Sequence, residues 1–248
     1  MRLFGAKRGE PSIPADTRVY AIGDIHGRAD LLRALRVQIA EDARRAPIAR
    51  KVVVYLGDYV DRGLESRTVI DLLIDEPLEG FESIHLKGNH EDFLLRFLED
   101  ATIGPVWLNN GGTATLISYG VGLGDGVHLE DRVLHAQAGL SAALPRAHKT
   151  FLEGLALMHE EGDYVFVHAG IRPGVPLDRQ APIDLMWIRE EFLASRATHP
   201  KVVVHGHSIT FTPETKPNRI GIDTGAYATG TLTALVLERT KRDFLHTL

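Results

Sequence analysis

The segment Gly57–Gly63, which reads Gly-Asp-Tyr-Val-Asp-Arg-Gly, constrains this chain more than any other part of it. It directly follows Lys51–Leu56, a β-branched and apolar run of the kind that forms a buried strand in a parallel sheet. A strand that ends in glycine and aspartate places carboxylates at the edge of the sheet where open α/β proteins form their binding sites. Aspartate and glycine after a strand also form simple turns, so this segment alone leaves both interpretations open.

The same pattern occurs on either side of this segment. Arg18–Ile22 reads as a strand that ends in Gly23–Gly27, and Phe81–Lys87 reads as a strand that ends in Gly88–Glu91. Parallel strands joined by right-handed crossovers point their carboxyl ends the same way, so the three polar turns meet at one edge of one sheet. Apolar residues at helical spacing predict the connecting helices within Leu31–Ala43 and Ser66–Asp75.

Two later strands also end in histidine. Asp163–Val167 leads to His168, and Lys201–Val204 leads to His205-Gly206-His207. A single histidine after a strand is more often structural than a ligand, but five polar strand ends in one chain favour a site. Oxygen and imidazole ligands suit manganese, iron, zinc or magnesium, and a carboxylate can bridge two ions. Two such ions activate a water and bind the oxygens of a displacement at phosphorus, so the pattern predicts a two-metal site.

The composition of the chain limits the classes of partner that we expect it to bind. The 248 residues carry 28 lysines and arginines against 33 aspartates and glutamates, a net charge of −5, so no broad basic surface is expected to attract nucleic acid. The chain has no cysteine, which excludes disulfides and thiolate metal ligands. No apolar stretch is long enough to span a bilayer and the first residues lack a signal-peptide core, so we expect a cytoplasmic protein with no membrane partner.

The expected domain organisation is simple. Residues 1–16 combine glycine, proline and charge and are expected to form a loose lead-in. Residues 17–248 are expected to form one domain, in which residues 101–155 form a helical and loop-containing cap beside the cleft. The last ten residues, 239–248, are expected to be a charged tail.

Taken together, the five turns carry a recognisable signature. Gly-Asp-Ile-His-Gly, Gly-Asp-Tyr-Val-Asp-Arg-Gly, Gly-Asn-His-Glu, Val-His-Ala-Gly and Gly-His, in this order, resemble the motifs of calcineurin-like metallophosphoesterases of the phosphoprotein phosphatase branch. The resemblance extends from Thr17 to Leu237 and is greatest to bacterial and bacteriophage lambda-type serine/threonine protein phosphatases; Trp107–Gly112, Met186–Glu190 and Ile222–Gly225 resemble their connecting segments. It implies an α/β fold, a metallophosphoesterase-type β-sandwich flanked by α-helices, with a di-metal site at the carboxyl ends of the strands.

The resemblance also implies a ligand set. Two divalent metal ions are the expected cofactors; manganese is the expected metal, with iron, zinc, nickel or magnesium as alternatives. His207 is preferred to His205 because the family's ligand follows the glycine. Broader metallophosphoesterases have another histidine where this chain has Ile209, as expected of the phosphatase branch. The implied ligands are Asp24, His26 and Asp58 for the first ion, and Asp58, Asn89, His168 and His207 for the second, with Asp58 bridging.

Roles in catalysis follow the same resemblance. A hydroxide that bridges the two metals is expected to attack phosphorus directly, without a covalent intermediate. His90 is the expected general acid for the leaving alkoxide, and Asp61 is expected to hold its tautomer and charge. Arg62 and Arg189, together with Asn89, are expected to bind the phosphoryl oxygens, because a guanidinium matches them in a bidentate fork. Arg172 remains an alternative to Arg189.

Three functions remain open at this stage. The first is a metal-dependent phosphomonoesterase, a serine/threonine protein phosphatase whose partner is a phosphorylated protein or a small phosphoester. The second is a symmetrical dinucleoside polyphosphate hydrolase acting on diadenosine tetraphosphate, because Val167–Ile171 and Ile222–Gly225 also resemble those enzymes. The third is a non-catalytic binding module. Glu91 and the chain length favour the first, and the sequence leaves the oligomeric state open.

Overall fold

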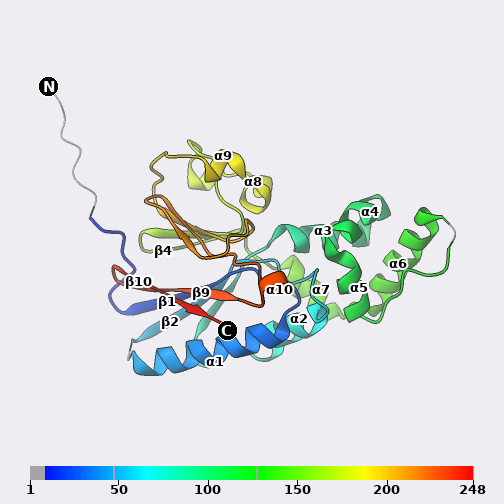
Figure 1. Cartoon of the computed structure of the whole chain (residues 1–248), viewed down its shortest axis with the longest axis horizontal. Coiled ribbons are helices and arrows are strands. Elements are labelled where there is room, and N and C mark those ends of the chain that lie inside the picture. Colours follow the sequence, from blue (N-terminus) through cyan, green and yellow to red (C-terminus); the bar gives the residue numbers. More distant parts are fainter. Residues whose placement is uncertain (1–8, 47, 127, 248) are drawn as a thin grey trace.

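Two five-stranded sheets lie face to face in a computed structural model that describes residues 9–46, 48–126 and 128–247 (Figure 1). The first sheet has the strand order β10-β9-β1-β2-β3, and the second has the order β4-β5-β6-β8-β7. The strands of the first sheet are β1 (Thr17–Ile22), β2 (Arg50–Tyr55), β3 (Glu82–His85), β9 (Thr233–Glu238) and β10 (Lys241–His246). Those of the second are β4 (Met158–Glu161), β5 (Tyr164–Val167), β6 (Val202–His205), β7 (Glu214–Thr215) and β8 (Arg219–Gly221).

The β-α-β-α-β unit expected from the sequence is present in the first sheet. Strand β1 pairs in parallel with β2, and β2 pairs in parallel with β3. The crossovers are helix α1 (Ala29–Arg45) and helix α2 (Ser66–Asp75), which lie together below the first sheet in Figure 1. Strand β9 pairs with β1 in the antiparallel direction and β10 continues from it. The carboxyl ends of β1, β2 and β3 therefore share one edge, as predicted.

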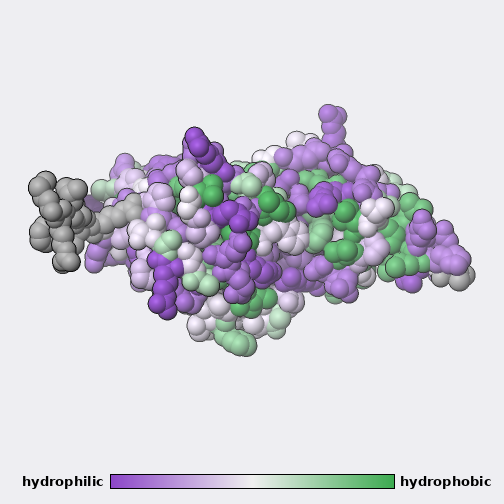
Figure 2. All heavy atoms as spheres, turned by 90° about the horizontal axis from the view of Figure 1, so that it is seen from above, coloured by the Kyte–Doolittle hydropathy of each residue, from purple (hydrophilic) through white to green (hydrophobic). Residues whose placement is uncertain are grey.

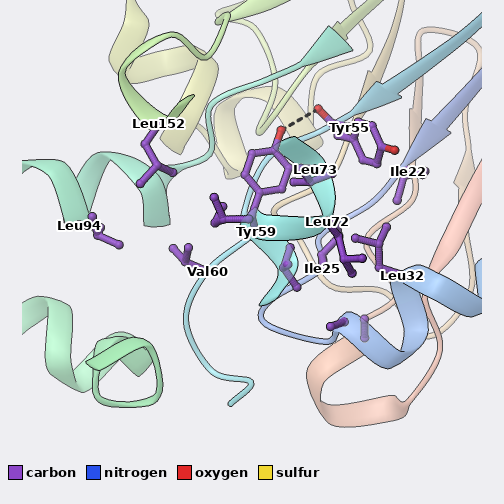
Figure 3. Packing of buried hydrophobic residues seen from close by; sticks show 14 of the residues in the cluster. Ile22, Ile25, Leu32, Tyr55, Tyr59, Val60, Leu72, Leu73, Leu94 and Leu152 are labelled. Carbon is purple, nitrogen blue, oxygen red and sulfur yellow. Dashed lines mark hydrogen bonds between the residues drawn. The ribbon is translucent and has the colours of Figure 1, made fainter. Parts of the chain in front are cut away.

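The hydrophobic core has three parts because each sheet has two faces to cover. Alternating residues of β1 and β2, such as Val19 and Val54, meet Phe166 and Val204 of the second sheet in the layer between the sheets. The opposite face of the first sheet packs on the helices; Figure 3 shows part of this cluster, where the Tyr59 hydroxyl donates to the Tyr55 carbonyl at 3.3 Å. A smaller cluster joins the second sheet to helices α8 (Pro182–Trp187) and α9 (Glu190–Leu193).

A group of helices extends from one end of the sandwich (Figure 1). Pro145 falls between two of these helices, of which one ends at Ala143 and the next begins at Arg146. The group contains α3 (Asn89–Glu99), the 3-10 turn η1 (Ala101–Ile103), α4 (Gly104–Trp107), the π-helical turn η2 (Leu108–Gly112), α5 (Thr113–Ser118), α6 (Leu129–Ala143) and α7 (Arg146–Glu153). Residues 101–155 are thus helical along most of their described length.

The remaining short elements are η3 (Leu177–Arg179) and α10 (Ala226–Thr229). Two details differ from the sequence-based expectation. Strand β3 is shorter than Phe81–Lys87 and ends at His85. The charged segment after residue 238 is not a tail, because residues 241–246 form the edge strand β10, where charged side chains are tolerated on the solvent face.

The ends of the described chain and its surface add three observations. Residues 1–8 lie outside the described residues; residues 9–16 form neither helix nor strand, yet Ile13 is buried and its N–H donates to Arg239 O at 2.9 Å. Across residues 9–46, 48–126 and 128–247, no helix combines the length and hydropathy that a bilayer-spanning segment needs. The face in Figure 2 is largely hydrophilic, with small separate hydrophobic patches.

Candidate metal centre

Asp58 lies at the point where the strand ends from both sheets converge. Its Oδ2 atom is 3.5 Å from His26 Nε2, and its Oδ1 atom is 3.4 Å from His168 Nε2. It belongs to two groups whose ligand atoms lie within 4.8 Å of one another: His26, Asp58 and His90 form one, and Asp58, His168 and His207 the other. All of these residues are buried. One carboxylate is therefore shared by two imidazole clusters, as a bridging ligand would be.

The backbone is strained at this convergence. His26, Asp58, Asp61, Arg62 and His207 all have φ values between 47° and 71°, a left-handed region that costs side-chain-bearing residues free energy. Such conformations persist only where the surroundings fix them.

Glu91 fixes part of this backbone. Its buried carboxylate accepts from the N–H groups of Asp58 at 2.9 Å, Tyr59 at 2.7 Å and Gly88 at 2.9 Å, and so joins the turn after β2 to the turn after β3. The approach is close: a Cβ atom on Gly88 would lie 2.1 Å from Asp58 Oδ1, so only glycine fits there.

Burial favours the neutral form of three of these imidazoles, which is the form that binds metals. Burial lowers the pKa of His26 to about 3 and that of His207 to about 2, and it also lowers the pKa of His168. Burial alone would raise the pKa of Asp58, but the nearby imidazoles, His168 foremost, hold it below its ordinary value. The centre thus presents an ionised carboxylate among neutral nitrogen donors.

The donor atoms fit a cation. His26 Nδ1 donates to Val60 O and His168 Nδ1 donates to Leu56 O, each at 2.9 Å, which leaves the Nε2 lone pair of each neutral ring facing the centre. Among the described residues, His26 Nε2 is buried without a hydrogen-bond partner. His168 Nε2 and Asn89 Oδ1, both acceptors, face each other at 2.9 Å with no proton to share. Cations bound in the two groups would satisfy all three atoms.

Asp24 lies beside these groups without belonging to either. Its two carboxylate oxygens accept from His207 N at 3.0 and 3.2 Å. Burial, followed by the charges of Asp223 and Asp58, raises the pKa of Asp24 above its ordinary value. The pKa of Asp223 is itself raised to about 6 by burial. A divalent cation would relieve this concentration of buried carboxylates.

His90 and Asp61 form a buried pair next to the first group. His90 Nδ1 donates to Asp61 Oδ2 at 2.7 Å, and His90 Nε2 is 3.8 Å from Asp58 Oδ2. Burial opposes the charged ring, but Asp58 and Asp61 together raise the pKa of His90. Arg62 Nη2 lies 3.3 Å from His90 Nε2, and the guanidinium stacks 4.7 Å from the ring centre of Tyr227. An imidazole with a raised pKa and a guanidinium therefore border the same centre.

The structure distinguishes the two candidate arginines of the second sheet. Arg172 makes a bidentate pair with Asp184 at 2.7 and 2.8 Å and also pairs with Glu191 at 2.6 Å. Arg189 is exposed, and its charge contributes, after burial, to the lowered pKa of His168 and His207. The guanidinium of Arg172 is thus committed to carboxylates, whereas that of Arg189 is exposed and makes a small contribution to the pKa of two imidazoles of the centre.

The structure also shows contacts near the centre that the sequence did not predict. His205 Nε2 lies 3.2 Å from Arg219 Nη1 and its Nδ1 lies 3.0 Å from Gly206 O, so both ring nitrogens have partners outside the two ligand groups. Trp107 and Thr115 both contact Asp61, although the sequence assigned them no role. The only sequence signal for them was the Trp-Leu-Asn-Asn-Gly-Gly segment, which contains Trp107 but stops short of Thr115.

A β-sandwich with helices on its outer faces and a buried Asp–His–Asn centre at its strand ends defines a metallophosphoesterase. The family model of calcineurin-like phosphoesterases matches residues 17–232, and the chain belongs to this family. The chain is 30% identical over 225 residues to serine/threonine-protein phosphatase 2 of Salmonella typhimurium, covering 86% of this chain and 90% of that protein.

Further relatives differ in the substrate that their names state. A bis(5'-nucleosyl)-tetraphosphatase PrpE (asymmetrical) from Anoxybacillus flavithermus is 25% identical over 243 residues, covering 86% of this chain and 88% of that protein. A solved structure described as a putative diadenosine tetraphosphatase superposes with a TM-score of 0.63 at 23% identity, over 95% of this chain and 96% of that one. Other matches are partial: the chain spans 9% of the phosphatase BSL2 of Arabidopsis thaliana and 34% of an uncharacterized protein of Caenorhabditis elegans.

Proposed function

We propose that this phosphoesterase is a serine/threonine protein phosphatase that hydrolyses phosphomonoesters by direct attack of water. The observation that carries the proposal is the single carboxylate of Asp58 shared by two imidazole groups, with the His90–Asp61 pair beside it. The similarity along most of both chains to serine/threonine-protein phosphatase 2 supports the choice of substrate.

In this proposal some residues of the centre hold the metals and others bind the substrate. The ions, when bound, would supply an activated water and neutralise charge on the phosphoryl group. Arg62 and Arg189 bind the phosphoryl oxygens, and Asn89 orients them from the second ion's side. His90 gives its Nε2 proton to the leaving alkoxide while Asp61 stabilises the charged ring. Asp24, His26 and Asp58 hold the first ion, and Asp58, Asn89, His168 and His207 hold the second, with manganese as the preferred metal.

The position of His90 in the first ligand group is consistent with the acid role. Its Nδ1 atom is taken up by Asp61, so only Nε2 faces the centre. The pKa of His90 is raised whereas those of His26, His168 and His207 are lowered, so His90 is the imidazole most suited to carry a proton. This contrast supports the choice of His90 as proton donor and of the other three imidazoles as metal ligands.

Hydrolysis of dinucleoside tetraphosphates is the second candidate, because a tetraphosphatase is among the relatives matched along most of their length. The deciding experiment compares turnover of a phosphoserine peptide, a phosphothreonine peptide and diadenosine tetraphosphate by the manganese-loaded enzyme. We expect kcat/KM to be greatest for the phosphopeptides. Cleavage of the nucleotide alone would overturn the protein phosphatase proposal, and the absence of all three activities would favour a binding module.

A further inference from the structure

Asp61 is a fully buried carboxylate with three hydrogen-bond donors. Its Oδ2 atom accepts from His90 Nδ1 at 2.7 Å and from Trp107 Nε1 at 2.9 Å, and its Oδ1 atom accepts from Thr115 Oγ1 at 2.6 Å. Trp107 and Thr115 are themselves completely buried. Burying a carboxylate is unfavourable unless hydrogen-bond donors satisfy it, so the two donors besides His90 offset the cost of placing Asp61 here.

Both of these donors come from one interrupted helix of the cap. Trp107 ends α4 and Thr115 lies in the first turn of α5, with the π-helical turn η2 between them. Two residues eight apart on a straight α-helix point roughly 80° away from each other. The interruption, where Gly111 has a φ of 108°, changes the phase of the helix and brings both side chains to the same carboxylate. Such π-helical turns are frequent at functional sites.

The same segment holds the backbone that carries Asp61. Asp61 and Arg62 have φ values of 71° and 67°, a left-handed conformation that is unfavourable for residues with a side chain. Asp61 N donates to Thr115 Oγ1 at 2.9 Å, and Arg62 N donates to Gly111 O at 3.2 Å. A Cβ atom at Gly111 would lie 2.7 Å from Arg62 Cγ, so the two segments are in direct contact.

We propose that Trp107 and Thr115 are positioning residues for proton transfer by His90, acting through Asp61; the proposal rests on the phosphomonoesterase function proposed above. Their two hydrogen bonds fix the rotation of the Asp61 carboxylate. Asp61 then holds the Nδ1–H of His90, which directs Nε2 at the centre, where Arg62 Nη2 lies 3.3 Å from it. During turnover the protonated imidazole passes its Nε2 proton to the leaving alkoxide and becomes neutral. The cap thereby contributes to the chemical step as well as to the shape of the cleft.

Matched variants of Thr115 test this proposal. Thr115→Val keeps the shape and removes the hydroxyl, whereas Thr115→Ser keeps the hydroxyl. The manganese-loaded proteins are assayed with a phosphoserine peptide, whose alkoxide must be protonated, and with p-nitrophenyl phosphate, whose phenolate leaves without help. We expect Thr115→Val to lower kcat for the peptide roughly 10- to 100-fold and kcat for the aryl phosphate less than about threefold, with KM unchanged for both. Thr115→Ser should restore the peptide rate to within about threefold of wild type.

A combination with His90→Asn separates positioning from a structural role. If Thr115 acts through the acid, Thr115→Val should cause no further loss of kcat once His90 is replaced. Equal losses on both substrates, or a loss that persists in the His90→Asn background, would overturn the proposal.

Should the valine variant fail to fold, Trp107→Phe repeats the test. This substitution removes the indole N–H donor together with part of the ring. It is measured with the same two substrates and in the same His90→Asn background. Loss of peptide turnover that exceeds the loss on the aryl phosphate supports the proposal, and equal losses overturn it. A wild-type enzyme inactive on both substrates would instead refute the phosphomonoesterase function itself, so the two failures are distinguishable.

Discussion

Among single residues, His90 in its proposed role as general acid can be tested most sharply. His90→Asn removes the Nε2 proton while keeping an amide that can reach Asp61. We expect kcat for a phosphoserine peptide to fall roughly 100-fold or more and kcat for p-nitrophenyl phosphate to fall far less, because general acid catalysis matters most for the poorer leaving group. Steady-state assays with both substrates check this, and equal losses would remove His90 from the acid role.

The two arginines make a matched pair. Arg189→Gln should lower kcat/KM for phosphopeptides roughly 10- to 100-fold and leave the melting temperature nearly unchanged, because the guanidinium is exposed and its proposed partner is the substrate. Arg172→Gln should lower the melting temperature and leave kcat/KM nearly unchanged, because it breaks the bidentate pair with Asp184. The check is kcat/KM together with thermal unfolding for both variants. A larger activity loss for Arg172→Gln would exchange their roles.

Most residues of the metal centre could be predicted from the sequence, for a physical reason. Each of the six residues expected as ligands stands just after a strand, and parallel strands bring their ends together whatever the intervening sequence. The structure gathers His26, Asp58, His168 and His207 as expected. It could not be predicted that Arg172 is bonded to Asp184, because that pairing depends on how the segment after β5 packs on α8.

At the scale of elements, the edge of the helix-facing core contains a histidine that responds to pH. His85, at the end of β3, stacks on Tyr55 with a ring separation of 4.9 Å and meets Phe151 of α7 at 5.1 Å. Burial, and then the charge of Arg36, lowers the pKa of His85 to about 4. A depressed pKa means that the unfolded chain binds the proton first, so this contribution to stability is complete above about pH 6.5 and is lost as the pH falls toward 4.

His85→Phe keeps an aromatic ring in this place and removes the titration. Between pH 7 and pH 5, the free energy of unfolding of the wild type should therefore fall by about 2 kcal/mol more than that of the variant. Denaturant unfolding of both proteins at the two pH values measures the difference, and the remaining titratable groups contribute equally to both. Identical pH dependence in the two proteins would show that His85 is not held neutral by burial.

The sequence predicted some of the helices and strands and missed others. The crossover helices α1 and α2 were visible because their apolar residues recur at helical spacing. The strand β10 was missed because its outward-facing charges hide the alternation of an edge strand. The contacts of Trp107 and Thr115 with Asp61 were also invisible, since they depend on a change of helical phase at Gly111 that no periodicity reveals.

At the scale of the whole molecule, the metals are expected to stabilise the join between the two sheets. Asp58 belongs to the turn after β2, whereas His168 and His207 follow strands of the second sheet, so ions bound there would crosslink the sandwich. Manganese at about 1,000 times its Kd should stabilise the protein by about 4 kcal/mol for each ion, roughly 10 °C in melting temperature for a chain of this size.

Asp58→Asn should lose most of that gain, because it removes the shared charge. Thermal unfolding with manganese and with a chelator measures the effect, and Asp178→Asn, which alters an exposed carboxylate, is the matched control. An Asp58→Asn protein that keeps the full manganese-dependent shift would refute the shared-ligand assignment.

The most direct test of the account is the anomalous difference density of a crystal grown with manganese. The account predicts two peaks on either side of the Asp58 carboxylate, one next to Asp24 and His26 and the other next to Asn89, His168 and His207. A single peak, or two peaks of which neither contacts Asp58, would contradict it.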